Sequence, residues 1–552
     1  MNSTNYLTLR RLLLSGSPKK LCLAVILSVL SGALYALIIP TILSGLSDDH
    51  QFILGDEHKE HVQTWFFLLI FCVLLTKASS VILVNNLAKT AVAKLRIDLS
   101  KKINAMEVSQ VEKMGLPKML NMLTEDMSRI TGAALAVPMV LVSGVTALGM
   151  LAYLSILDFK IFMFTILGIV VGLFLFQFPV SRTKKYYSKS RDLKDTMQNG
   201  FRGLIYGVYE LKLNKDKSTR FLEKEISKPT VESLKNEKKG DFIIHIAGNA
   251  SEILCFFAIG MVVFLLPKGA DFQHQNLYGV VMALLYITGP IASILDLMQR
   301  LKFGEISINK INELYAIDVS EYQSKVQINK DWKHLNLKNI KYSYESSDHS
   351  FSIGTIDLTI RRGETCFVVG GNGSGKSTLS KVVSLHYLPN EGHVLFDDQV
   401  VDKDSITSAR ERLFVIYSDY FLFNTVYKEL TEKDLSLIDK YLKLFNLSGK
   451  TQLIGNDFTT VKLSDGQRRR LALIVALVED RDIYILDEWA ADQDPEFKDL
   501  YYRFVLPDLK QRGKTVIAIT HDDRYFDCCD RVIKMENGSI LENFEPIKLE
   551  AG

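Results

Sequence analysis

Apolar residues are distributed unevenly along this chain of 552 residues. Up to about residue 300 they form runs of about 20 residues, the length that a helix needs to cross a hydrocarbon layer of ~30 Å. After about residue 310 they occur in short β-branched runs that alternate with helix-like stretches. The pattern predicts a helical transmembrane domain at 1–310, a linker at 311–333 and an α/β domain with a largely parallel sheet at 334–552.

The first domain contains six predicted membrane-spanning helices. They lie at about 21–46, 64–86, 133–157, 161–180, 243–266 and 277–298. The first apolar run follows four basic residues, Arg10, Arg11, Lys19 and Lys20, as a signal peptide would. It is too long for the apolar part of a signal peptide and five further runs follow it, so we interpret it as a membrane helix.

The positions of Lys and Arg predict how these helices are oriented. Both residue types are frequent in the connecting segments 87–132 and 181–240, whereas the segment 47–63 carries one Lys among five acidic residues. Basic connections stay on the cytoplasmic side of a membrane. We therefore expect a multi-pass protein of the cell (inner) membrane, with both termini and the α/β domain in the cytoplasm.

Composition narrows the class of protein. Hydrophobic residues make up 47% of the chain and charged residues 23%, which excludes disordered, collagen-like and disulfide-rich secreted proteins. The 66 Lys and Arg nearly balance the 63 Asp and Glu, and a net charge of +3 gives no argument for a nucleic-acid partner. The six cysteines include no CxxC pair, so we expect them to be reduced and structural.

A glycine-rich loop lies between the strand-like TCFVV and the helix-like STLSKVVSL. It consists of Gly370, Gly371, Asn372, Gly373, Ser374, Gly375, Lys376 and Ser377, and it matches G-x-x-x-x-G-K-[ST]. The backbone N–H groups of such a loop and of the next residue, Thr378, can surround the phosphates of ATP. Lys376 can reach the β and γ oxygens, and Ser377 can bind Mg²⁺. The flanking strand and helix favour this interpretation over a chance glycine turn.

Two carboxylates, Asp487 and Glu488, follow the apolar strand-like IYIL. Asp487 would act on Mg²⁺ directly or through water, and Glu488 would polarise the attacking water. His521 follows another apolar strand-like run, TVIAIT. An apolar strand before two acids is weak evidence by itself, and a lone histidine is usually structural. Their place after a phosphate-binding loop indicates that Lys376, Glu488 and His521 are catalytic.

Between these elements lies a short motif formed by Leu463, Ser464, Asp465, Gly466 and Gln467. It resembles the LSGGQ signature of ATP-binding-cassette (ABC) proteins, and six spans followed by one cassette resemble a type IV ABC exporter half-transporter over essentially the whole chain. The resemblance implies ATP and Mg²⁺ as cofactors and a signature that binds ATP held by a second cassette. One signature and one phosphate-binding loop per chain then imply a homodimer.

The resemblance also assigns roles outside these motifs. It implies that Tyr344 stacks on adenine, for which an ordinary strand tyrosine is the alternative. It implies that parts of 106–122 and 203–217 dock onto the cassette. Where the family has a coupling glutamine this chain has Ser418, beside Asp419, so either could take its place near Mg²⁺.

Three segments resemble one group within the ABC family: DEWAADQDPEF, LPDLKQRGKTVIAITHDDRYF and LSDGQRRRLAL. They look like those of the cyclic-peptide and siderophore exporters, a group that includes exporters of pyoverdine precursors and microcin-type peptides. The loop that usually reads SALD in the family is Ala491, Asp492, Gln493 and Asp494 here, and Asp465 replaces a signature glycine.

Polar residues inside the predicted spans mark a candidate substrate cavity. Lys77 interrupts the second span, and His245, Asn249 and Glu252 follow Asp241 at helical spacing along the fifth, near Phe256. A structural Lys–Glu pair between helices is the alternative.

We therefore expect ATP-driven export of a small peptide-derived molecule from the cytoplasm, namely a cyclic or modified peptide or a siderophore precursor. A homodimer surrounded by membrane lipids would export it by alternating access. The alternatives are a lipid or lipid-linked-glycan flippase and, less favoured, a non-transporting channel or regulator. Glu488 and His521 argue against the channel, because a gate needs no sustained ATP turnover.

Overall fold

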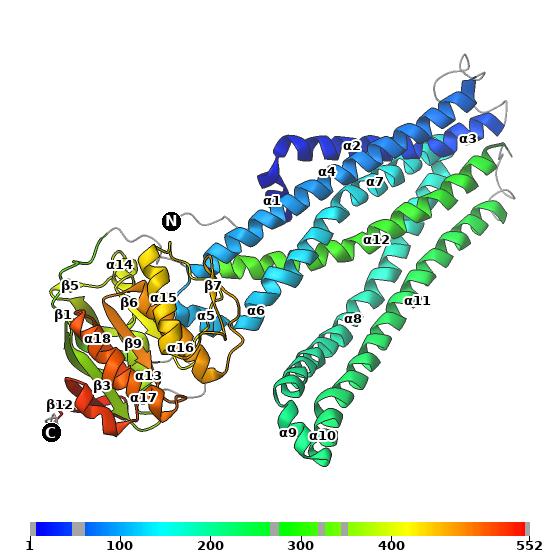
Figure 1. Ribbon diagram of the computed structural model, residues 1–552. Helices are drawn as coiled ribbons and strands as arrows, with labels where there is room; N and C mark the ends of the chain where they lie inside the picture. Colours follow the sequence, from blue (N-terminus) through cyan, green and yellow to red (C-terminus); the bar gives the residue numbers. More distant parts are fainter. Residues whose placement is uncertain (1–6, 47–60, 265–274, 318–325, 344–350, 547–552) are drawn as a thin grey trace. The chain divides into compact units, whose positions relative to one another are not determined.

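The computed structural model describes residues 7–46, 61–264, 275–317, 326–343 and 351–546 (Figure 1). The chain forms two compact units. The first contains Met1–Asp98 and Asn121–Ala316, and the second contains Leu99–Leu120 and Ile317–Gly552. A short segment between two long helices of the first unit therefore belongs to the second.

The first unit is built from helices. Its α-helices are α1 Leu9–Gly16, α2 Pro18–Ala36, α3 Ile38–Leu46, α4 Val62–Asn104, α7 Met127–Leu157, α8 Phe159–Tyr206, α9 Val208–Leu213, α10 Lys215–Phe221, α11 Lys228–Phe264 and α12 Gln275–Ala316. Two π-helical turns, η2 Met122–Asp126 and η3 Leu222–Ser227, precede α7 and α11. The end of α4 continues into the second unit, where α5 Val108–Met114 and most of α6 Leu116–Asn121 follow it.

Five segments among the described residues are long and apolar enough to cross a membrane. They are Pro18–Gly45, Val62–Asn104, Leu116–Leu157, Phe159–Tyr206 and Tyr278–Ala316. The fifth span expected from the sequence falls on α11 up to Phe264, and its last two positions lie outside the described residues. At 1.5 Å per residue, the 48 residues of α8 extend about 70 Å, more than twice the thickness of the hydrocarbon layer.

Close helix contacts hold this unit together. Helix α7 packs against α2 and α12, and α8 packs against α11. Gly304 of α12 lies so near α7 that a Cβ at this position would be 2.2 Å from the Ala133 Cβ. Small residues allow such close packing between membrane helices, where the hydrophobic effect gives little driving force. On the other pair, Ser190 and Ser233 hydroxyls are 2.9 Å apart and join α8 to α11.

The second unit is an α/β domain with two main sheets. The six-stranded sheet has the order β12-β11-β3-β10-β9-β6, and all neighbours in it are parallel except β12. The four-stranded sheet has the order β2-β1-β4-β5 and is antiparallel. The strands are β1 His334–Ser343, β2 Ser352–Arg361, β3 Thr365–Gly370, β4 Glu391–Phe396, β5 Gln399–Val400, β6 Leu413–Ile416, β7 Leu453–Ile454, β8 Asp457–Phe458, β9 Ile483–Asp487, β10 Thr515–Ile519, β11 Arg531–Glu536 and β12 Ser539–Phe544.

Helices cover both faces of the parallel sheet. They are α13 Lys376–Val383, α14 Ile406–Arg410, α15 Glu432–Leu444, α16 Asp465–Glu479, α17 Pro495–Leu500 and α18 Leu506–Gln511, with the π-helical turn η5 Tyr501–Val505 and the 3₁₀ helix η6 Asp523–Cys528. Because side chains alternate along a strand, β3 contributes to two hydrophobic cores. Phe367 packs into one core, and Cys366 and Val368 pack into the other. This explains the uninterrupted apolar runs that the sequence shows for these strands.

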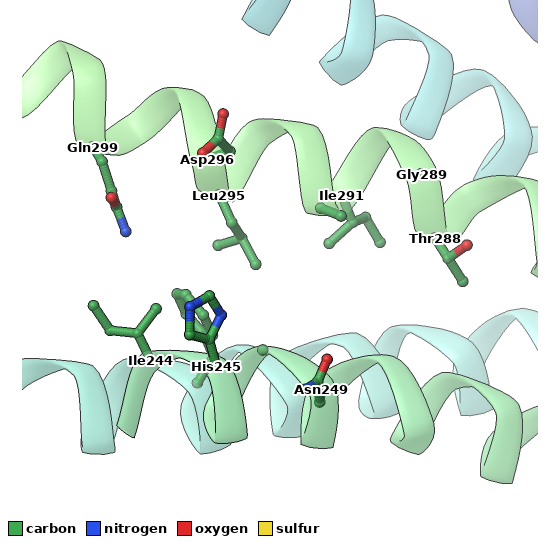
Figure 2. A pocket seen from close by; sticks show the side chains of 12 residues that line it. Ile244, His245, Asn249, Thr288, Gly289, Ile291, Leu295, Asp296 and Gln299 are labelled. Atoms are coloured by element: carbon green, nitrogen blue, oxygen red, sulfur yellow. The ribbon is translucent and has the colours of Figure 1, made fainter. Parts of the chain in front are cut away.

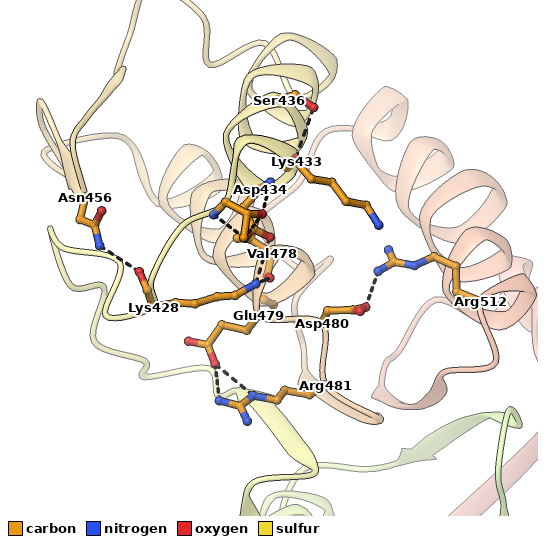
Figure 3. Close-up of polar contacts among 12 residues, drawn as sticks. Lys428, Lys433, Asp434, Ser436, Asn456, Val478, Glu479, Asp480, Arg481 and Arg512 are labelled. Atoms are coloured by element: carbon orange, nitrogen blue, oxygen red, sulfur yellow. Dashed lines mark hydrogen bonds and ion pairs between the residues drawn. The ribbon is translucent and has the colours of Figure 1, made fainter. Parts of the chain in front are cut away.

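Ion pairs and hydrogen bonds anchor the C-terminal end of α16 (Figure 3). Asp480 ends the helix in a left-handed conformation, with φ of 53°, and its carboxylate pairs with Arg512 and with Lys514. Lys428 donates to the Asp434 carboxylate at 2.9 Å and to the Val478 carbonyl at 2.8 Å. These contacts fix the helix that carries the signature motif at its other end.

Candidate functional site

Three neighbouring parallel strands end beside the candidate catalytic residues. Strand β3 ends at Gly370 and β9 ends at Asp487, while β10, which lies between them, ends at Ile519, two residues before His521. Parallel strands place their carboxyl ends at one edge of the sheet, where α/β proteins bind ligands. The fold therefore brings together residues that are far apart in the sequence.

The glycine-rich loop adopts a conformation that needs its glycines. Gly370, Gly373 and Gly375 have φ angles of 156°, 78° and 102°, in a region that other residues rarely adopt. A Cβ at Gly370 would lie 2.4 Å from the Met535 carbonyl oxygen, so no larger residue fits there. The loop leads directly into α13, which begins at Lys376.

The side chain of Lys376 folds across this loop. Its Nζ donates to the carbonyl oxygens of Gly370 and Gly371 at 2.9 and 3.0 Å. The lysine is buried, with an exposed fraction of 6%. Its positive charge therefore lies inside the loop, among the glycines Gly370 to Gly375, where it can face the phosphates of a nucleotide.

Asp487 is buried at the end of β9, with an exposed fraction of 2%. Its Oδ1 atom has no hydrogen-bond partner in the described part of the chain. Burial and the neighbouring Glu488 carboxylate raise the pKa of Asp487 to about 6, against the opposing effects of the Lys376 ammonium and the Ser377 hydroxyl. A bound divalent cation stabilises the charged form of such a buried carboxylate, and Mg²⁺ prefers oxygen ligands. Ser377 and Asp487 therefore fit an ATP-bound Mg²⁺ ion.

Glu488 and His521 face each other at the same edge. Their Oε1 and Nε2 atoms are 3.3 Å apart. The backbone of Glu488 is left-handed, with φ of 51°. Two hydrogen bonds help to hold this conformation: the Glu488 N–H donates to the Ile519 carbonyl at 3.1 Å, and the Arg469 side chain donates to the Glu488 carbonyl. Strained backbone of this kind is typical of functional sites. The half-exposed Glu488 carboxylate can reach a water molecule, as a general base requires.

The signature motif caps the N-terminus of α16. The Ser464 N–H donates to the Gln467 Oε1 at 3.3 Å, and the Gln493 side chain donates to the Gly466 carbonyl at 3.0 Å. A Cβ at Gly466 would lie 2.8 Å from the Asp492 carbonyl oxygen. The unusual loop Ala491–Asp494 therefore packs directly on the signature and requires a glycine there.

Charged residues surround the signature as well. Leu463 is half-buried, whereas the Asp465 side chain is exposed and lies 3.7 Å from Arg468. Arg469 pairs with Asp492 at 2.8 Å. The aspartate that replaces a signature glycine thus points to solvent. Arg468 and Arg469 offset the negative charges of Asp465 and Asp492.

The structure also describes most of the remaining candidate residues of this site. Ser418 and Asp419 are exposed and follow β6, the strand beside β9. Tyr344 lies outside the described residues, so its role stays a prediction. Asn372, Ser374 and Thr378 complete the glycine-rich loop and the first turn of α13.

Comparisons with known proteins agree with this arrangement. The family model of the ABC transporter matches residues 353–491, and that of the ABC transporter transmembrane region matches residues 21–200. The ATP-binding protein SyrD of Pseudomonas syringae pv. syringae is 33% identical over 507 residues, which cover 88% of this chain and 89% of that protein. This chain belongs to the ABC transporter family. It is a transporter ATPase with membrane-spanning helices.

Two further comparisons concern ABC transporters of known type. An ATP-dependent lipid A-core flippase of Methylobacillus flagellatus is 26% identical over 476 residues, which cover 82% of this chain and 79% of that protein. The solved structure of a bacterial Atm1-family ABC exporter with ATP bound has a TM-score of 0.78 at 16% identity and covers 96% of this chain and 95% of that one. This ABC transporter therefore has a type IV-like exporter fold, with a helical transmembrane domain before the ATPase domain.

The helical unit of the transporter contains a cavity of about 440 Å³ between α11 and α12. Figure 2 shows His245 and Asn249 of α11 and Leu295 and Gln299 of α12 pointing into the space between the helices. Two of the polar residues that the sequence indicated on α11, His245 and Asn249, line it, and α12 adds Thr288, Asp296 and Gln299. The apolar part of the lining comes from Phe176, Ile244, Ile291, Ala292 and Leu295.

Two other candidate cavity residues, Lys77 and Phe256, are not among the described residues that line it. The Lys77 ammonium lies over the Tyr35 ring, 5.1 Å from its centroid. Phe256 is exposed on α11, and the side chain of Glu252 lies outside the described residues. Asp296 and Gln299 were difficult to recognise from the sequence, because both lie at the end of an apolar span and resemble interfacial residues.

Proposed function

We propose that this ABC transporter exports a small peptide-derived molecule from the cytoplasm, such as a cyclic or modified peptide or a siderophore precursor. The observation that supports this cargo is the cavity between α11 and α12. Imidazole, amide and hydroxyl groups lie in it beside the side chains of Ile291 and Leu295. Such a lining suits a compact amphipathic molecule with hydrogen-bonding groups better than a bare ion.

The direction of transport rests on charge and on the exporter fold. The basic segments 87–132 and 181–240 favour a cytoplasmic location for the ATPase domain and both termini in an inner membrane. ATP is then consumed on the side from which cargo enters. Ser377 and Asp487 would hold Mg²⁺ with ATP, and Glu488, oriented by His521, would accept a proton from the attacking water.

A lipid flippase is the second candidate. A relative with this activity in its name covers most of the chain, and a lipid head group with its acyl chain is also amphipathic. The two candidates differ in what should stimulate the ATPase. A peptide exporter responds to peptide in a constant lipid mixture, whereas a flippase responds to the lipid itself.

Substitution in the cavity should weaken the response to cargo. Asn249→Leu removes a side-chain amide from the cavity, and we expect the uptake of an amphipathic cyclic peptide into inside-out vesicles to fall about 5- to 10-fold, as for one lost hydrogen bond of ~1–1.5 kcal/mol. Ile246→Leu is the control, because Ile246 is exposed on the same helix and does not line the cavity. Equal uptake by both variants would show that the cavity does not bind the cargo.

We also propose that two copies of the chain form two shared ATP sites. Each chain has one phosphate-binding loop and one signature, and the family resemblance pairs each loop with the signature of the other chain. The pairing predicts the behaviour of heterodimers assembled from two different variants.

Lys376→Ala and Ser464→Arg should each abolish nucleotide trapping in a homodimer. In a heterodimer that contains one chain of each kind, one site carries both lesions and the other carries neither. We expect about one trapped nucleotide per heterodimer, isolated through two different affinity tags and trapped with vanadate. If each chain formed its own site, every site in the heterodimer would carry a lesion and no nucleotide would be trapped.

A further inference from the structure

The packed helices α8 and α11 carry a group of basic residues at the level where both are expected to leave the membrane. Tyr187 on α8 donates to the Asp241 carboxylate on α11 at 2.6 Å, whereas Thr230, earlier on α11, donates to the sulfur of Met197, later on α8. The two helices therefore run in opposite directions (Figure 1). The end of the span predicted at 161–180 thus lies beside the start of the span predicted at 243–266.

Two open grooves on this pair of helices are lined by cations. Six exposed side chains contribute them, which we name the basic patch: Arg182, Lys184 and Lys185 on α8, and Lys235, Lys238 and Lys239 on α11. Tyr186 borders both grooves, so they adjoin each other. The stretch 181–190 contains four basic residues and no acid. The patch therefore concentrates positive charge at one level of the helix pair.

The acids on the facing part of α11 are engaged by other groups. The Glu232 carboxylate lies 2.6 Å from Lys189 Nζ, and the Glu237 carboxylate lies 2.5 Å from Lys194 Nζ. The Asp241 carboxylate accepts the hydrogen bond from Tyr187. Among the described side chains, no acid lies within ion-pair distance of the basic patch. Its charge is thus available to an anion from outside the chain.

Exposed aromatic side chains continue the patch toward the membrane. Phe174, Phe178 and Arg182 follow one another at intervals of four residues, which places them on one face of α8. The two phenylalanine rings stack with centroids 6.1 Å apart, and the Arg182 guanidinium lies over the Phe178 ring, 4.4 Å from its centroid. On α11, the exposed Phe242 lines the same groove as Lys238. Both helices therefore present apolar surface directly beside the cations.

We propose that the basic patch binds an anionic phospholipid of the surrounding membrane. The phosphate of the head group lies among the lysines, and the acyl chains lie along Phe174 and Phe178. Basic pockets between membrane helices on the cytoplasmic side suit such head groups, and the cytoplasmic leaflet carries negative charge. The cavity residues His245 and Asn249 line neither groove. The lipid is therefore a bound partner of the transporter, separate from the cargo.

Other occupants match the surface less well. A free phosphate ion would use the cations and leave the neighbouring phenylalanines exposed to water. A symmetric contact with the same patch on a second copy of the chain would bring like charges together, which is unfavourable. An anionic lipid matches both the charges and the apolar side chains.

Native mass spectrometry of the full-length transporter in detergent tests the proposal, because it counts bound lipids and reports the oligomeric state in one measurement. The protein is titrated with anionic phosphatidylglycerol and with zwitterionic phosphatidylcholine that has the same acyl chains. The patch variant combines Lys184→Gln, Lys185→Gln, Lys238→Gln and Lys239→Gln. A rescue variant has Arg at the same four positions. The matched control removes four exposed lysines of the ATPase domain instead: Lys338→Gln, Lys403→Gln, Lys433→Gln and Lys450→Gln.

We expect the wild type to bind its first phosphatidylglycerol at least about 10-fold more tightly than phosphatidylcholine, because each lysine near an anionic lipid surface contributes a factor of about 5. The patch variant should lose this preference, whereas the rescue and control variants should keep it. Phe178→Ala should weaken phosphatidylglycerol binding about 3-fold, since it removes apolar contact with the acyl chains. Phe71→Ala, which removes an exposed phenylalanine of α4, should not weaken it.

Four results would overturn the proposal. Two of them are a wild type that binds both lipids equally and a patch variant that binds phosphatidylglycerol as tightly as the wild type does. The third is displacement of phosphatidylglycerol by an equal concentration of inorganic phosphate, which would indicate a site for the free ion. The fourth is a smaller dimer population in the patch variant with unchanged lipid binding, which would assign the patch to a contact between copies. Because no cargo is present, these results leave the proposed export function to its own tests.

Discussion

Glu488→Gln should lower the ATPase rate of the purified transporter by about 10²-fold or more and leave it holding ATP. The amide has nearly the same shape as the carboxylate and can still accept a hydrogen bond from His521, whose Nε2 lies 3.3 Å away. It cannot accept a proton from the attacking water. Binding and geometry are therefore retained while the general base is lost.

The measurement is steady-state phosphate release together with the amount of ATP retained after gel filtration. Glu496→Gln is a matched control, because Glu496 is an exposed acid on α17, eight residues further along the chain. It should hydrolyse ATP at the wild-type rate. Near-normal turnover by Glu488→Gln would exclude Glu488 as the base.

Asp487→Asn should abolish most Mg²⁺-dependent hydrolysis and, without Mg²⁺, make the folded transporter more stable. The loss of activity, about 10²-fold, follows from removing a charged ligand that fits Mg²⁺. The gain in stability follows from burial, which raises the pKa of Asp487 to about 6. Above this pH the folded chain keeps an unfavourable buried charge that the asparagine lacks.

The sign of the pH dependence follows from the same pKa shift. Since the folded state binds this proton more tightly than the unfolded state does, the wild type loses stability as the pH rises from about 4 to 6, and above that range the cost is roughly 1–3 kcal/mol. We expect the gap in melting temperature between Asp487→Asn and the wild type to widen over this range in EDTA. Asp398→Asn, at an exposed position, is the control. A constant gap would show that burial of the Asp487 charge is not the cause.

The two-part fold could be predicted from the sequence because its signals are local. Apolar runs of membrane length and short β-branched runs are visible within windows of about 20 residues. The type IV-like exporter fold expected from the motifs is confirmed. The glycine-rich loop is equally local, since its spacing alone implies a loop that only glycines can form.

Contacts between residues that are far apart in the sequence could not be predicted from local patterns. Glu112 and Tyr387 are 275 positions apart, and nothing in the seven residues of α5 marks its carboxylate as a partner for a cassette tyrosine. The docking of 106–122 was expected from family resemblance alone. Asp296 and Gln299 could not be recognised as cavity residues until the pairing of α11 with α12 placed them opposite His245.

Departures from the family pattern were visible in the sequence, but their consequences were not. Ala491–Asp494 reads differently from its usual form, and the structure shows why the chain tolerates it: Gln493 bonds the Gly466 carbonyl and Asp492 pairs with Arg469. Ser418 stands where a glutamine was expected, and the neighbouring Tyr417 makes the hydrogen bonds that reach α13. The replacement residue and its neighbour must be considered together.

Peptide export can be tested by ATP-driven uptake of a fluorescent acylated cyclic peptide into inside-out membrane vesicles. The same preparation, reconstituted in proteoliposomes, is assayed for flipping of a fluorescent phospholipid, and Glu488→Gln serves as the inactive control in both. If the transporter exports peptides, the peptide should accumulate with Mg²⁺-ATP in the wild type only and should stimulate the ATPase. Robust lipid flipping without peptide uptake or peptide-stimulated ATPase would contradict it and favour the flippase.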